Sequence, residues 1–217
     1  SFNAAPIVQF PLNYLKGQSW DAFPATSNRW YPWSKTTTLP FGGATNKTYP
    51  TPLLSNIEFS DNGAMILDFC DRSGHQYGNF NYRDLSGTTL ASIFVGGELL
   101  AVGKNCGTGI YSLESAGTYT SEGVAFTSST GVGRPGPSTI NGTGTGYTGA
   151  VGEFFNWDDA QLQGDNNDHS EGMQGGAAVL RGDAKVFTTH MDPIVFNTGG
   201  TSKHSTTNGV GSSAYQM

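Results

Sequence analysis

The sequence predicts an all-β fold, and three observations point to it. Charged residues make up only 13% of the chain, against roughly 25% in an average globular domain. The 31 glycines stand in turn-like segments, with β-branched and aromatic residues between them. No stretch places apolar residues at i, i+3 and i+4 over three turns, so any helix is expected to be short. This balance is typical of a secreted all-β protein rather than a cytosolic enzyme.

The predicted strands include two well-marked hairpins. In the first, Ile57 and Phe59 alternate with polar neighbours, the turn contains Asn62-Gly63, and an apolar run over 65–69 returns. Asn-Gly between apolar runs is a strong hairpin signal because both residues tolerate positive φ. The second hairpin is expected over 175–190, with its turn at 181–183. Further strands are expected over 7–14, 93–95, 99–102, 110–113 and 124–127.

The two hairpins match each other at a constant offset of 121 residues, which suggests an internal repeat. This offset is about two to three times the period of 40–50 residues that is typical of propeller blades. The match therefore favours β-propeller blades, with a β-sandwich as the alternative. One domain is expected to span 1–217, with a Gly/Thr-rich surface loop over about 131–152. The matched pairs include Phe59 with Leu180, Asn62 with Asp183, Met65 with Val186, Ile66 with Phe187 and Cys70 with Met191.

The net charge and the lengths of the apolar runs argue against two kinds of partner, nucleic acid and the membrane interior. A net charge of −6, with eleven scattered Lys and Arg residues, argues against nucleic acid as a partner. No apolar run reaches the roughly 20 residues that span a bilayer, so membrane insertion is not expected.

Cys70 and Cys106 could form a disulfide that closes a loop of about 36 residues, or could remain two thiols that act as small hydrophobes.

Several segments, among them 10–14, 30–33, 52–59, 65–76, 152–155, 169–171 and 186–193, match a known family pattern in order. Together they resemble the propeller-like region of large secreted bacterial surface proteins that also carry serine-aspartate-repeat B-like, immunoglobulin-type domains. The resemblance implies a cell-surface or secreted location, with earlier blades before the matched region and further sequence after it. It carries over no catalytic residues.

An acidic segment with amide oxygens follows Trp157 and contains the ligand types that Ca²⁺ prefers. Its spacing fits neither the EF-hand nor the nonapeptide calcium repeat, so a solvated turn is the alternative reading. The same acids could supply the two carboxylates of a glycosidase, although neighbours on one loop are usually just exposed. The aromatic rings Trp33 and Trp157 could stack on a sugar or could be core residues. The candidate calcium ligands are Asp158, Asp159, Asp165, Asp168 and Glu171.

The sequence therefore predicts a structural or adhesive segment of a secreted bacterial surface or matrix protein, without catalytic machinery or an obligatory cofactor. Its expected partners are other parts or copies of the same protein, because open sheet arrays need to be closed by other polypeptide. The alternative is a glycan-binding module, with Ca²⁺ as a candidate cofactor. A secreted glycan-active enzyme is the third hypothesis.

Overall fold

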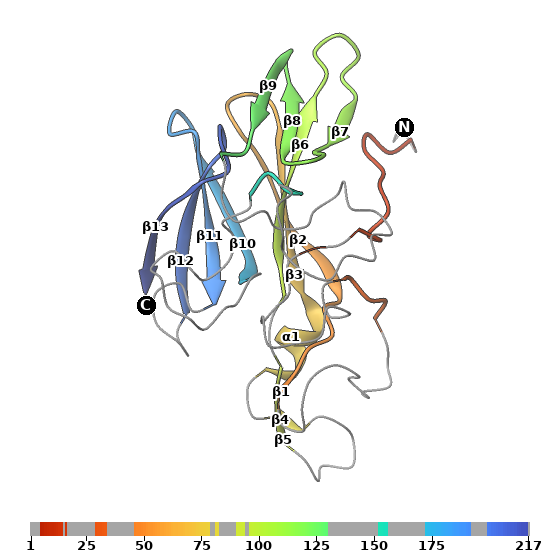
Figure 1. Ribbon diagram of the computed structural model, residues 1–217, viewed down its shortest axis with the longest axis vertical. Helices are drawn as coiled ribbons and strands as arrows, with labels where there is room; N and C mark the ends of the chain where they lie inside the picture. Colours follow the sequence, from red (N-terminus) through yellow and green to blue (C-terminus); the bar gives the residue numbers. More distant parts are fainter. Residues whose placement is uncertain are drawn as a thin grey trace.

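The computed structural model describes residues 5–14, 16, 29–33, 46–78, 81–82, 90–93, 96–129, 152–155, 172–191 and 199–216. Within these ranges the protein is all-β, with a single short helix (Figure 1). Among the described residues, no helix is long and apolar enough to cross a membrane.

The first sheet is a four-stranded antiparallel meander in the order β2-β3-β6-β7. Its first hairpin is the one predicted from the Asn-Gly turn. Ser60 donates its N–H to Ala64 at 3.0 Å, and Gly63 turns the chain with a φ of 78°, which favours glycine at this position. The strands are β2 (Pro52–Phe59), β3 (Met65–Asp71), β6 (Glu98–Lys104) and β7 (Tyr111–Leu113).

The second sheet is another four-stranded antiparallel meander, in the order β10-β11-β12-β13. Its first two strands confirm the second predicted hairpin. The alternating burial along β11 and β12 shows that one face of this sheet packs inward and the other is partly exposed. The strands are β10 (Met173–Leu180), β11 (Lys185–Met191), β12 (Gly199–Ser205) and β13 (Gly211–Gln216).

Smaller elements complete the described fold. A two-stranded sheet of β8 (Thr118–Ser121) and β9 (Val124–Thr127) stands beside the first sheet, and α1 (Arg72–Tyr77) follows β3 directly. A mixed sheet in the order β1-β5-β4 lies at the far end of the molecule in Figure 1. Its strands are β1 (Asn46–Lys47), β4 (Asn81–Tyr82) and β5 (Leu90–Ile93).

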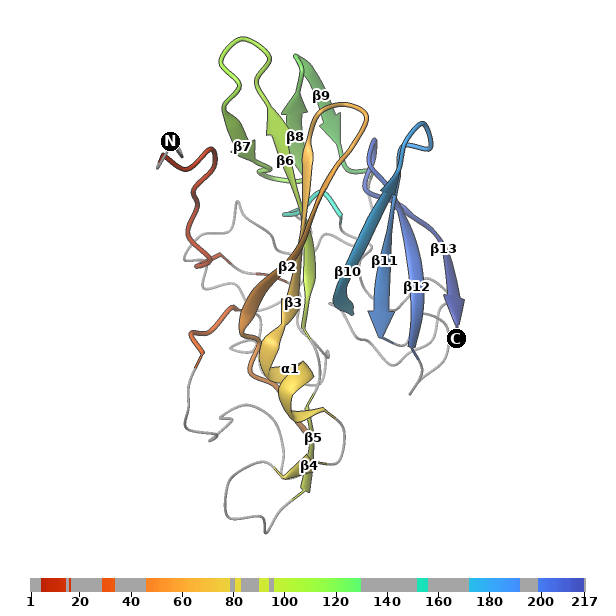
Figure 2. The ribbon, with the colours of Figure 1, turned by 180° about the vertical axis from the view of Figure 1, so that it is seen from behind.

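The two meanders meet at their first strands. β10 packs against β2 and β3, while β11, β12 and β13 lie progressively farther from the first sheet (Figures 1 and 2). At the start of β10, Met173 bridges to Gly97, where a Cβ atom would lie 2.2 Å from the Met173 carbonyl oxygen. Only glycine allows this close approach of the two backbones.

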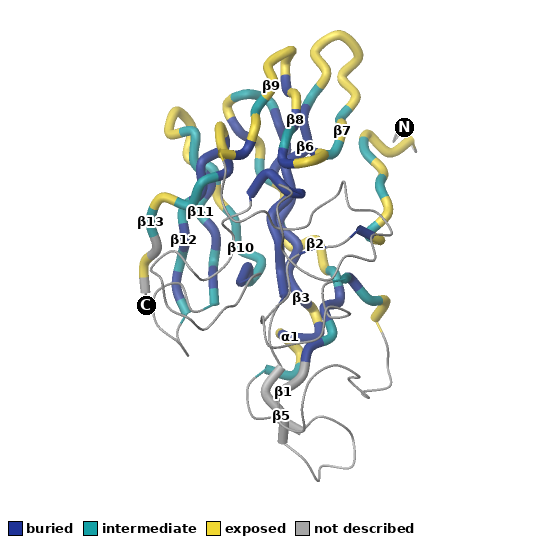
Figure 3. Tube along the Cα trace, viewed as in Figure 1, coloured by how far each residue is buried: buried dark blue, intermediate teal, exposed yellow. Residues whose placement is uncertain are grey.

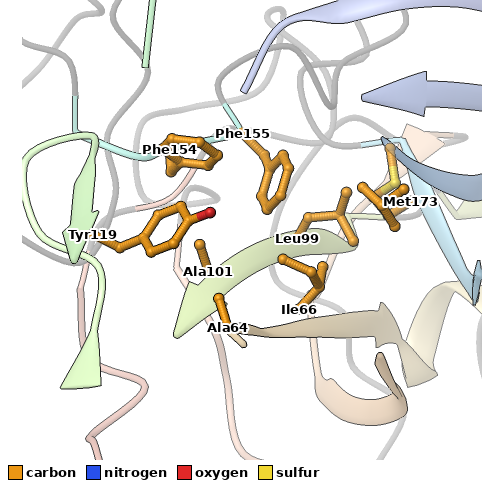
Figure 4. Close-up of a cluster of buried hydrophobic side chains, with 9 residues drawn as sticks. Ala64, Ile66, Leu99, Ala101, Tyr119, Phe154, Phe155 and Met173 are labelled. Carbon is orange, nitrogen blue, oxygen red and sulfur yellow. The ribbon is translucent and has the colours of Figure 1, made fainter. Parts of the chain in front are cut away.

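A hydrophobic cluster fills the wedge that opens between the two sheets (Figure 4). Ile66 and Leu99 contribute from the first sheet, Val186 from the second, and Tyr119 from β8. The adjacent rings Phe154 and Phe155 complete the cluster, and the Phe155 ring also reaches the His204 ring on β12.

The opposite face of the first sheet is also covered, so that β3 is buried along its whole length (Figure 3). Residues 5–14 run across this face without forming the strand that the sequence predicts. Pro11, which lacks an N–H, interrupts this segment. Every second side chain of this segment nevertheless packs on the sheet. Val8, Phe10, Leu12 and Tyr14 contact the cluster formed by Met65, Leu67, Phe69, Leu100, Val102 and Trp30.

The predicted repeat corresponds to a spatial relation between the two hairpins. The Asn56 side-chain amide donates to the Ala177 carbonyl at 2.5 Å, and the Gly182 N–H donates to the Asp61 carboxylate at 2.6 Å. Both pairs are 121 residues apart, so β2 and β10 run side by side in the same direction. The predicted offset of 121 does not hold for the second strands of the two hairpins, β3 and β11. Phe59 pairs with Met65, whereas Leu180 pairs with Lys185. The second turn is thus one residue shorter.

Candidate interaction surface

A row of exposed apolar side chains lies on β2, the edge strand of the first sheet. Leu54, Ile57 and Phe59 are 44%, 45% and 56% exposed. Their cross-strand partners on β3 are members of the buried cluster beneath residues 5–14. The β-bulge at Ser55 keeps Leu54 on the same face as the other two. We call these three residues the β2 row.

The β2 row faces away from β10. Asn56, on the other face of the strand, is the residue that contacts β10. On β10 the arrangement is similar, because Ala177 and Val179 pack against the wedge cluster whereas Leu180 is 61% exposed. Each of the two adjacent first strands therefore has one face inside the molecule and one apolar face exposed.

Buried hydrogen bonds hold the N-terminal segment beside the β2 row. The Glu98 carboxylate accepts from the Tyr14 hydroxyl and from the Trp30 indole N–H, the latter at 2.6 Å. Burial raises the pKa of Glu98, and the positive charge of Lys16 opposes that rise. These contacts fix the N-terminal segment over β3 and β6 and leave the outer face of β2 uncovered among the described residues.

Glu114 ties the wedge cluster to the first sheet. Its carboxylate accepts from the Ala101 N–H at 2.7 Å and from the Phe154 N–H. Burial raises the pKa of Glu114 to about 8 despite these two donors, and the nearby Glu98 adds to the rise. The side chain therefore acts as a structural link between β6 and the Phe154-Phe155 segment.

Asp68 is a buried carboxylate on β3 whose environment differs from those of Glu98 and Glu114. Its side chain is fully buried, and neither carboxylate oxygen has a hydrogen-bond partner in the part of the chain that the structure describes. Burial alone raises the pKa of Asp68 to about 7. Such a group is destabilising when ionised.

The buried face of the second sheet contains a polar cluster with two of the four histidines. The Ser202 hydroxyl lies 2.9 Å from the Thr188 hydroxyl and 2.7 Å from Nε2 of His204. Burial, together with His190, lowers the pKa of His204 to about 3. Both imidazoles are enclosed by the sheet, so they contribute to packing rather than to an accessible site.

Asp71 and Arg72 are adjacent at the start of α1 but have separate roles. The Asp71 carboxylate accepts from the Ser73 N–H at 2.9 Å and caps α1. The Arg72 guanidinium lies 4.4 Å from the centre of the Trp33 ring. Trp33 is 44% exposed, and sugar stacking on its ring stays a prediction.

The proposed disulfide is wrong in this structure, because both cysteines are free. Cys70 is buried on β3, and Cys106 lies in the exposed turn between β6 and β7. Burial raises the pKa of the Cys70 thiol, which corresponds to the alternative of a small buried hydrophobe.

The predicted calcium ligands Asp158, Asp159, Asp165, Asp168 and Glu171 lie outside the described residues, as does the candidate stacking residue Trp157. So does the predicted loop, except for Gly152 at its end. In the ranges that the structure describes, no three His, Cys, Asp or Glu side chains come together as metal ligands.

Comparisons of the chain with models of protein families, with curated proteins and with solved structures gave no match. The resemblance to bacterial surface proteins therefore stays a prediction from the sequence.

Proposed function

We propose that the chain is a structural module of a bacterial surface or matrix protein, and that it assembles through the β2 row. The observation that carries this proposal is the position of the row. It lies on the first strand of a sheet whose other face already packs against the first strand of a second sheet. An apolar edge strand is a natural template for association with another chain.

We further propose that the two meanders are blades of a radial array. Four-stranded antiparallel sheets with adjacent, parallel first strands and diverging outer strands are the arrangement of propeller blades. The convergence of β2 and β10, and the wedge filled by Phe154 and Phe155, support this interpretation. In such an array the first strand of each blade has a neighbour on both sides, and the β2 row would be one of these contacts.

The occupant that fits the β2 row best is a second copy of the chain. Inside the molecule, the inner faces of β2 and β10 meet through Asn56 and Ala177. Their outer faces are both apolar, and Phe59 and Leu180 occupy corresponding positions along the two strands. Docking the outer face of β10 from one copy on the β2 row of the next would repeat the internal arrangement. This contact is heterologous, so it builds a ring or a filament.

Sedimentation velocity across a wide range of protein concentrations tests this proposal. We expect the wild type to form concentration-dependent oligomers and the Ile57→Lys/Phe59→Lys double variant to stay monomeric, because each lysine places a charge in the contact. Val124→Lys is the matched control, since Val124 is 55% exposed on β9, away from the row. A wild type that remains monomeric throughout, or a control that dissociates as the double variant does, would refute the proposal.

The surface location is proposed from composition, because few charges and many hydroxyl and amide side chains are typical of secreted β proteins. Antibody labelling of intact producing cells tests it. Labelling only after the cells are lysed would contradict a surface or matrix location. That the chain is not an enzyme stays a prediction.

A further inference from the structure

An open hollow lies where the end of β3, α1 and the start of β10 meet. Its volume is about 460 Å³, within the roughly 300–1,000 Å³ that is usual for small-molecule sites. The polar side chains in its wall are those of hydroxyl, amide, imidazole and guanidinium groups, and no described carboxylate lines it. The residues that matter here are Leu53, Ser55, Arg72, His75, Gln76 and Gln174.

Arg72 is held in place by the backbone around it. Its N–H donates to the Thr51 carbonyl at 2.8 Å. The neighbouring Asp71 carboxylate is occupied by the N–H groups of Thr51 and Ser73, both at 2.9 Å, and of Gly96 at 3.3 Å. Asp71 is therefore fully engaged in fixing the backbone and is not the partner of the Arg72 side chain.

The Arg72 guanidinium is available to an anion. Among the described residues it makes no ion pair with a carboxylate, and its contact there is the stacking on Trp33 at 4.4 Å. Stacking of this kind uses the flat face of the guanidinium and leaves its N–H edge free for a bidentate carboxylate. His75 is exposed on the same wall, so a guanidinium and an imidazole both line the hollow.

We propose that this hollow is a binding site for an acidic carbohydrate, such as a chain of uronic acid residues. The carboxylate of the sugar would accept from the edge of Arg72, while its hydroxyl groups would bond to the Gln76 and Gln174 amides. Leu53 offers apolar surface to the C–H face of a sugar ring. Because the hollow is open, neighbouring sugar units can extend into solvent.

This site is separate from the assembly surface. Leu53 and the β2 row lie on opposite faces of β2, since Leu53 pairs with Cys70 and Leu54 with Phe69. The Ile57→Lys/Phe59→Lys double variant should therefore bind the sugar as the wild type does, and a failure of self-assembly would leave the binding result interpretable.

Isothermal titration with oligogalacturonate tests the site, with a neutral cello-oligosaccharide of the same length as reference. Arg72→Gln removes the cation and should weaken binding roughly tenfold or more, since hydrogen bonds to charged groups are among the stronger ones. Arg181→Gln is the matched control, because Arg181 is exposed in the β10–β11 turn, outside the hollow. His75→Gln, at an exposed position, is a second test that should also weaken binding.

Selective binding of the acidic sugar, lost in Arg72→Gln and weakened in His75→Gln but kept in Arg181→Gln, would support the proposal. Equal binding of the neutral sugar would overturn it, as would equal losses in the Arg72 and Arg181 variants or no binding at all. Inorganic phosphate that binds as tightly as the sugar would indicate a simple anion site and would also overturn it. Thermal unfolding at the wild-type midpoint establishes that each variant is folded.

Discussion

Asp68→Asn should stabilise the protein at pH 8 and leave its stability nearly unchanged at pH 4. Asp68 is fully buried on β3, and its carboxylate oxygens have no hydrogen-bond partner among the described residues. In the unfolded chain the carboxyl group ionises around its ordinary pKa of 3.8, whereas in the folded protein burial raises the pKa to about 7. Asn has nearly the same shape and is neutral at every pH, so it removes only the cost of the charge.

The size and sign of this effect follow from proton linkage. Between the two pKa values the folded state keeps a proton that the unfolded state releases, so this group's contribution to the free energy of unfolding falls as the pH rises. The fall is complete once the pH exceeds about 7 and amounts to about 4 kcal/mol, at 1.36 kcal/mol per pH unit. At pH 4 the carboxyl group is protonated in the folded state and a little more than half ionised in the unfolded state, so the contribution has fallen by only about 0.5 kcal/mol.

Urea denaturation of the wild type and Asp68→Asn at the two pH values measures this difference directly. Comparing the two proteins at each pH cancels the contributions of Glu114, Asp71 and other buried groups. Asp183→Asn, at an exposed position in the β10–β11 turn, is the control and should change the free energy of unfolding by less than about 0.5 kcal/mol at either pH. An equal gain for Asp68→Asn at both pH values, or a loss at pH 8, would refute the reasoning.

Two further predictions concern the contact between the sheets and the thiols. Gly97→Ala should lower the free energy of unfolding by about 2–3 kcal/mol in urea denaturation, because the added Cβ would lie 2.2 Å from the Met173 carbonyl oxygen. Gly199→Ala, whose added Cβ would have nothing within 4 Å, should lower it distinctly less. Equal losses in the two variants would contradict the close approach. Cys106 should react with a thiol reagent in the native protein, and the buried Cys70 only on unfolding; rapid modification of both thiols, or of neither, would show that this assignment is wrong.

Much of the fold follows from local sequence signals, and the remainder depends on tertiary pairing. The hairpins around Gly63 and Gly182 were predictable because turn residues and apolar alternation coincide there. β12 and β13 were not, because segments such as Gly199–Ser205 contain glycine, serine and threonine but hardly any apolar side chains. They become strands through the ladder with β11, where the Thr188 and Ser202 hydroxyl groups meet inside the sheet.

The candidate sites were harder to predict from the sequence than the strands. Trp33 was identified as a stacking candidate from its residue type, but its pairing with Arg72 depends on how residues 29–33 lie beside α1. The β2 row was hidden because Ile57 and Phe59 fit the pattern of a half-buried strand equally well. Only the position of β2 at the sheet edge exposes them. The burial of Glu98 and Glu114 has no sequence signal, because their partners lie 13 to 84 residues away.

The head-to-tail contact between copies is tested most directly by disulfide trapping in a background that carries Cys70→Ser and Cys106→Ser. One copy carries Phe59→Cys and the other carries Leu180→Cys, and the two are mixed under mild oxidation. We predict efficient crosslinking between the two different variants and little crosslinking of either variant with itself. Efficient crosslinking of Phe59→Cys with itself would instead indicate a two-fold contact between β2 rows, and the absence of any crosslink would contradict the assembly surface altogether.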